Sequence, residues 1–100
     1  MFADEKISSW WTPERVAFAL GNYVEVSQAC TLEAVEAMVD IDRAIAQLTP
    51  RLRAIADRYW RRDYDQSEIA REEKASQQRV SALAQDARRE ITDFLCRGVV

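Results

Sequence analysis

The chain has 100 residues, 48% of them hydrophobic, a formal net charge of −3, and only two glycines and two prolines. This length fits one domain with one small core, and so few helix breakers indicate long helices and an all-α fold. No apolar run reaches the ~20 residues of a membrane span, and no leader pattern indicates secretion. We therefore expect a cytoplasmic protein.

The residue types that many enzymes and metal sites need are scarce. There is no histidine, and the two cysteines, Cys30 and Cys96, are far apart, so no zinc site is expected. We expect two reduced thiols, Cys30 in the core and Cys96 near a helix end, while a disulfide between them stays open. No glycine-rich phosphate loop or nucleophile motif occurs. The sequence therefore predicts neither an enzyme nor a cofactor.

The N-terminal part is expected to hold a loose segment (1–11) followed by helices and an interaction or dimerisation region (12–48). Thr12 and Pro13 form a helix start, with an N-cap threonine and a first-position proline. Apolar residues then recur at helical spacing to about Val26, and a second helix is predicted at roughly 32–47.

This part also carries hydrophobic and acidic surface that needs an explanation. Its large aromatic residues exceed what the few remaining helices can cover, so we expect a homodimer or protein partner there; they are Trp10, Trp11, Phe18 and Tyr23. Residues 1–48 hold eight acidic and three basic residues, whereas residues 49–100 hold nine and eleven. The acids of the second helix form either a solvated face or a docking face for a basic partner; they are Glu33, Glu36, Asp40 and Asp42.

The C-terminal part (49–97) carries three helix-start signals. Thr49-Pro50 begins a helix that extends to about Arg62, Asp65 and Glu68 form a capping box, and Ser76 is a second N-cap. The last helix has a hydrophobic stripe from Val80 to Leu95. A short helix, a turn and a longer helix make a helix-turn-helix, whose second helix can enter a DNA major groove.

An alternative is one continuous helix from Gln66 to Phe94, because that stretch has no glycine or proline. The hydrophobic stripe is interrupted at Glu72 and Glu73, which favours a turn there. The helix-turn-helix interpretation predicts four or five helices in all, a break between about Glu72 and Ser76, and a shared core of Ile55, Ile69, Val80, Leu83 and Ile91.

About half of the chain, from Ile41 to Leu95, resembles the promoter-recognition domain, region four, of the sigma-factor family. The resemblance rests on Ile45, Leu48, the run 50–55, Trp60, Tyr64-Asp65, Glu68-Ile69-Ala70, Ser76, Val80 and Ala87-Arg88. Small phage transcription regulators and antiterminators use the same module. Lys74 occupies the position of the family's turn glycine, so the resemblance implies a positive φ at Lys74.

The resemblance implies a transcription regulator that binds DNA, RNA polymerase, or both. Polar residues early in the last helix would read bases, because Gln can pair with adenine and Arg with guanine; they are Gln77, Gln78, Arg79, Ser81 and Gln85. Four arginines would hold phosphates; they are Arg51, Arg53, Arg61 and Arg62. The alternative is a helical interaction module that binds transcription machinery or itself without touching DNA.

Overall fold

The computed structural model of the protein describes residues 10–97, which are helical and contain no strand. The elements are α2 (Pro13–Gly21), α3 (Tyr23–Gln28), α4 (Leu32–Ala46), α5 (Pro50–Ala56), the π-helical turn η1 (Asp57–Arg61), α6 (Gln66–Glu73) and α7 (Gln77–Cys96). The all-α prediction is confirmed. The described helices outnumber the four or five that we expected, because one predicted helix is divided in two.

The division occurs between α2 and α3, at Asn22. The helix starts as predicted, since the Thr12 side chain accepts a hydrogen bond from the Arg15 N–H at 3.2 Å. The Asn22 side chain and main-chain N–H both donate to the carbonyl of Phe18, at 2.9 and 3.0 Å. An asparagine side chain that bonds to nearby main chain competes with regular helix. The expectation of one helix to about Val26 was therefore wrong in its continuity.

Helix α4 begins at the predicted residue, and α5 begins at the predicted Thr49-Pro50 signal. The Thr31 side chain caps α4 by accepting from the Ala34 N–H at 3.1 Å, and Pro50 occupies the first turn of α5. The helix of α5 widens at its end into η1, where the Arg62 N–H bonds to the Asp57 carbonyl at 3.0 Å. Such π turns are frequent at functional sites.

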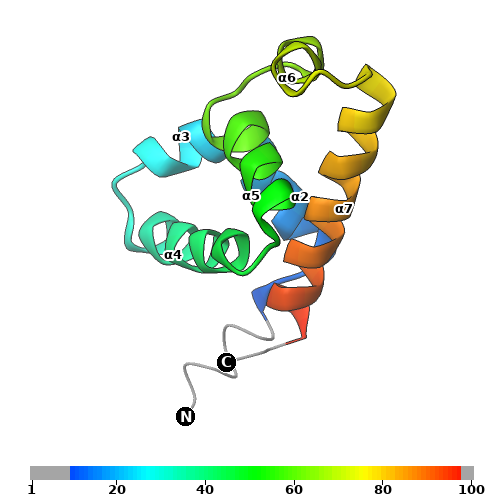
Figure 1. Ribbon diagram of the computed structural model, residues 1–100. Coiled ribbons are helices and arrows are strands. Elements are labelled where there is room, and N and C mark those ends of the chain that lie inside the picture. The colour runs from blue at the N-terminus through cyan, green and yellow to red at the C-terminus, as the bar shows by residue number, and fades with distance from the viewer. Residues whose placement is uncertain (1–9, 98–100) are drawn as a thin grey trace.

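Helix α7 is the central helix of the packing, because it contacts α2, α4, α5 and α6. Figure 1 shows α7 descending along the right side, with α6 across its upper end, α5 in the centre and α4 at the lower left. One face of α7 is buried at intervals of three and four residues, as a core-facing helix requires; its buried residues are Val80, Leu83, Ala84, Ala87, Ile91 and Leu95. The predicted shared core is confirmed, because Ile55, Ile69, Val80, Leu83 and Ile91 are all buried.

The predicted N-terminal aromatics divide into two kinds. Trp11 is buried and its indole N–H donates to Asp40 at 3.0 Å, and Tyr23 packs partly against the core. Trp10 and Phe18 remain 44% and 64% exposed. Residues 1–9, most of the segment expected to be loose, lie outside the described residues.

Candidate nucleic-acid interface

The break between α6 and α7 lies where the sequence predicts it. Helix α6 ends at Glu73, and Lys74 adopts the left-handed conformation, with φ 56° and ψ 44°. The Ala75 N–H then reaches back to the Ala70 carbonyl at 2.9 Å, which is the six-to-one hydrogen bond of a Schellman motif. The alternative of one straight helix from Gln66 to Phe94 is therefore wrong.

Both helix starts at this site are capped by side chains. The Glu68 N–H donates to Asp65 at 2.8 Å, and the Asp65 N–H donates to Glu68 at 3.0 Å, completing the capping box. Hydrogen bonds from the Ser67 hydroxyl and the Glu68 N–H hold the pKa of Asp65 below its usual value. The Ser76 hydroxyl accepts from the Arg79 N–H at 3.1 Å and so fixes the first turn of α7.

The residues expected to read bases lie within the first three turns of α7. Gln77, Gln78, Arg79 and Gln85 are exposed, and Ser81 is half-buried. Gln78, Ser81 and Gln85 follow each other at intervals of three and four residues, so they lie on one side of the helix. Arg71, near the end of α6, and Lys74, in the turn before α7, are also exposed.

The four arginines expected to hold phosphates have different surroundings. Arg51 and Arg53 are both exposed on the first turn of α5. Arg53 also donates to the Ala46 carbonyl at 3.2 Å. These two arginines remain accessible to an anion.

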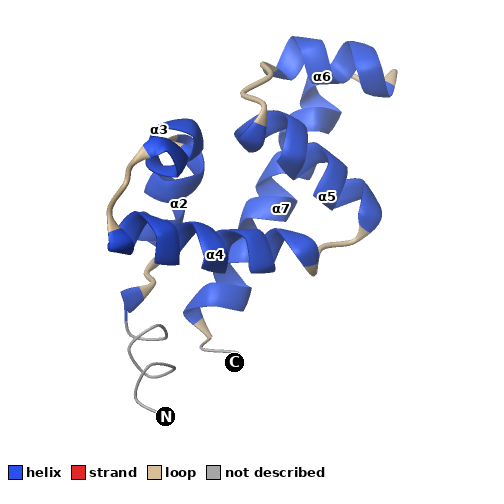
Figure 2. Cartoon of the chain, turned by 90° about the vertical axis from the view of Figure 1, so that its left-hand side faces the viewer, coloured by secondary structure: helices blue, strands red, loops and turns tan. Residues whose placement is uncertain are grey.

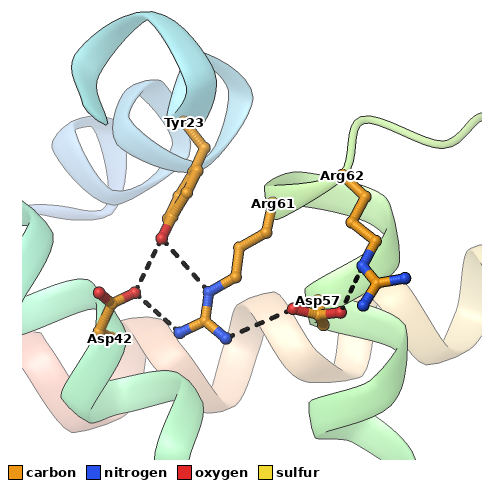
Figure 3. Close-up of polar contacts among 5 residues, drawn as sticks. All are labelled: Tyr23, Asp42, Asp57, Arg61 and Arg62. Atoms are coloured by element: carbon orange, nitrogen blue, oxygen red, sulfur yellow. Dashed lines mark hydrogen bonds and ion pairs between the residues drawn. The ribbon is translucent and has the colours of Figure 1, made fainter. Parts of the chain in front are cut away.

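Arg61 and Arg62 lie instead among acidic partners of the same chain (Figure 3). Arg61 donates to Asp42 at 2.8 Å and to the Tyr23 hydroxyl at 3.3 Å, and it lies 3.5 Å from Asp57. Arg62 pairs with the other oxygen of Asp57 at 3.1 Å. The structure therefore gives both arginines a structural role that the sequence had not suggested.

The cluster of Tyr23, Asp42 and Arg61 joins α3, α4 and η1. Burial raises the pKa of Tyr23, against the hydrogen bond from Arg61, and the hydrogen bond to Asp42 raises it further. Burial alone would lower the pKa of Arg61, but the hydrogen bonds to Asp42 and Tyr23 outweigh that effect and raise it. Arg61 is thus held charged between two elements of the N-terminal half.

Arg58 is a residue that sequence reasoning missed. It forms ion pairs with both Glu72 and Glu73 at the end of α6, the first at 3.2 Å. Glu72 and Glu73 are the residues that interrupt the hydrophobic stripe, and their ion pairs with Arg58 connect the end of α6 to η1. No local signal could reveal it, because Arg58 and Glu73 are 15 positions apart.

The predicted acidic face of α4 is divided by these contacts. Asp40 accepts from Trp11 and Asp42 from Arg61 and Tyr23, which leaves Glu33 and Glu36 exposed. Two of the four acids therefore stabilise the fold.

The cysteines differ from expectation in one respect. Cys30 is exposed, not in the core as predicted, because it lies in the short connection between α3 and α4. Cys96 is half-buried at the end of α7 as expected, and burial raises the pKa of its thiol. Both are free thiols.

The described residues provide neither a metal site nor a membrane span. Among residues 10–97, no group of three or more His, Cys, Asp or Glu side chains is placed to hold a metal ion. None of the helices in that range combines the length and the apolar character needed to cross a bilayer.

Comparison of the chain with protein-family models, with curated proteins and with solved structures gave no match.

Proposed function

We propose that the protein is a transcription regulator whose α6–turn–α7 unit binds DNA, with RNA polymerase or a sigma factor as its protein partner. The observation that carries this proposal is the joint geometry of the turn and the polar side of α7. Lys74 ends α6 in a left-handed turn, and Gln77, Gln78 and Arg79 follow directly as exposed residues on the first turn of α7. Recognition helices make their base contacts from this position.

The charges around the turn support the proposal. Glu72 and Glu73, which would repel phosphate, are both paired with Arg58. Asp86, further along α7, is paired with Arg89 at 2.9 Å. Basic residues near the turn have no such acidic partner within residues 10–97 and remain available to phosphate; they are Arg71, Lys74 and Arg79.

Of the four arginines expected to hold phosphates, we assign phosphate contacts only to Arg51 and Arg53. Arg61 is only 31% exposed and has three protein partners. Transfer of Arg61 to a phosphate would leave Asp42 without its charged partner. Arg62 shares Asp57 with Arg61, so we assign both to the fold.

Binding to mixed DNA fragments over a range of salt concentrations, with and without RNA polymerase, tests the proposal. Gln78→Ala should relax the preference at one base pair by about 1–3 kcal/mol, whereas Arg51→Ala should weaken all sequences and lower the salt slope by about one. Arg97→Ala is a matched control, because this exposed arginine lies beyond the C-terminal end of α7. It should change neither property.

The acidic balance of the chain predicts that the isolated protein binds DNA weakly. Tight binding by the isolated protein at physiological salt would contradict the need for a partner. No binding to any fragment, even with polymerase present, would contradict the DNA-binding proposal.

A second candidate is an interaction module without DNA contact. One observation favours it: the N-terminal half leaves large hydrophobic side chains of α4 at the surface, with Leu32 73% and Val35 53% exposed. Capture of polymerase or a sigma factor without any DNA binding would support this candidate.

A further inference from the structure

Helix α4 has two hydrophobic faces, and only one of them packs against the core. The inner face is buried and consists of Ala37, Ile41, Ala44 and Ile45. The outer face holds Leu32, Val35 and Val39, which are 73%, 53% and 48% exposed, and the exposed Ala46. These are three of the five large hydrophobic side chains that the described part of the chain exposes.

The outer residues form one continuous stripe. They are spaced by three, four and seven positions, so they line up along one side of the helix. Figure 2 shows α4 running across the front of the molecule, with no other helix between it and the viewer. We call this surface the α4 stripe: Leu32, Val35, Val39 and Ala46.

Two opposite charges flank the α4 stripe on the same edge. Glu36 and Arg43 are both exposed. They are seven positions apart, or about two helical turns, with Val39 near the middle. Within residues 10–97 neither of them takes part in an ion pair or a side-chain hydrogen bond. Asp40 lies between Glu36 and Arg43 along the helix, but it is half-buried and already accepts from Trp11. Asp42 is likewise already paired, with Arg61 and Tyr23.

This arrangement is complementary to itself. If two α4 helices pack antiparallel about a twofold axis near Val39, each residue on one edge faces the same edge of the other copy. Glu36 of each copy then meets Arg43 of the other, Val39 packs near Val39, and Leu32 packs near Ala46. We infer that the α4 stripe is covered by a second copy of this chain, in that antiparallel register.

The charges favour a second copy over a basic partner. A basic helix laid along the stripe would meet Glu36 but would also face Arg43, and like charges that face each other are unfavourable. A second copy pairs both charges and leaves none opposed.

The size of the surface sets the expected strength. A helix of 15 residues is about 22 Å long, so the contact falls below the ~1,200 Å² of a standard stable interface. We therefore expect a reversible dimer with a dissociation constant between about 1 µM and about 100 µM.

Sedimentation velocity of the whole chain from about 10 µM to about 1 mM tests the inference, across the range where such a dimer dissociates. Glu36→Arg and Arg43→Glu should each lower the association constant by about tenfold or more, because each single change places like charges together twice. The double variant E36R/R43E should restore association, since it only exchanges the two charges. Glu33→Arg is a control of equal charge change on the same helix, and it should leave association unchanged.

Circular dichroism of each variant checks that the chain stays folded, as all three positions are exposed. A wild-type chain that remains monomeric at about 1 mM, well above a micromolar dissociation constant, would overturn the inference. So would a double variant as weak as the singles, because the register depends on the exchange of charges. The readout is oligomeric state, so the result is independent of the proposed DNA binding.

Discussion

Helices α4 and α7 are both amphipathic, but they differ in how much of their hydrophobic surface the fold buries. Helix α7 turns its large hydrophobic residues inward, where they are buried or partly covered, and exposes polar residues along the opposite side. Helix α4 buries two alanines and two isoleucines on its inner face but exposes Leu32, Val35 and Val39 on the outer one. The two helices therefore present different surfaces to solvent: α7 exposes mainly polar residues, and α4 exposes a row of large hydrophobic residues.

The same substitution at two valines should test this difference most strongly. Val80 on α7 is fully buried, whereas Val39 on α4 is 48% exposed. Val80→Asp should cost several kcal/mol and unfold the C-terminal half, because it buries an unpaired charge. Val39→Asp should change the free energy of unfolding by no more than about 0.5 kcal/mol, as most surface substitutions do.

Denaturant unfolding monitored by circular dichroism, at a concentration where the chain is monomeric, measures both effects. Equal losses at the two positions would show that the outer face of α4 is packed in solution. An unchanged midpoint for Val80→Asp would place that side chain at the surface.

The next largest effect on stability should come from the ion pairs of arginines in and directly after η1. Arg58 holds Glu72 and Glu73, with 29% of its side chain exposed. Arg58→Ala should lower the free energy of unfolding by about 1–2 kcal/mol, because hydrogen bonds to charged groups contribute more than neutral ones.

Arg62→Ala is the matched control for Arg58. Its side chain is 60% exposed, and among the described residues it forms an ion pair only with Asp57, so the loss should be within the ~0–1 kcal/mol of surface ion pairs. Thermal melting of both variants decides between them. A loss at Arg62 as large as that at Arg58 would contradict a special role for the tie to α6.

A substitution in the turn between α6 and α7 should raise the free energy of unfolding, in contrast to the substitutions above. Lys74 has φ 56°, a conformation that costs a residue with a Cβ about 1–2 kcal/mol, whereas glycine adopts it freely. Lys74→Gly should therefore stabilise the protein, by about 0.5–1 kcal/mol after the larger entropy of the unfolded glycine chain is counted. Lys74→Ala keeps the Cβ and should show no such gain. A loss of stability in the glycine variant would show that the Lys74 side chain makes contacts that outweigh the strain.

The sequence predicted the features of this fold that depend on neighbouring residues. The capping box of Asp65 and Glu68, the caps at Thr12 and Ser76, and the buried side of α7 each involve residues a few positions apart, so their physics is local. The exposure of Gln77, Gln78, Arg79 and Gln85 also agrees with the expected site, while their contact with bases stays a prediction.

The remaining features depend on contacts between distant segments. Arg58 with Glu73, and Arg61 with Asp42, join residues 15 and 19 positions apart, and no spacing rule links them. The outward stripe of α4 was also not foreseen, because helical periodicity marks hydrophobic positions without saying which of two faces meets the core. Cys30 was misplaced for a similar reason, since small hydrophobic residues in connections are not fixed by periodicity.

The smallest expected effect on stability concerns the Tyr23 hydroxyl, which bonds to Asp42 of α4 and to Arg61 of η1. The folded-state pKa of Tyr23 is raised above its ordinary value of 10.0, so folding favours the neutral phenol. The stabilisation is therefore fully present below about pH 10 and is lost as pH rises through the folded-state pKa.

Tyr23→Phe removes the ionising group, and its free energy of unfolding should decline less steeply than that of the wild type above pH 10. Denaturant unfolding at several alkaline pH values compares the two slopes, with Tyr59→Phe in η1 as a matched control for the loss of a tyrosine hydroxyl. Identical slopes for wild type and Tyr23→Phe would mean that Tyr23 ionises equally in the folded and unfolded chains, and that Asp42 and Arg61 hold α4 in place without it.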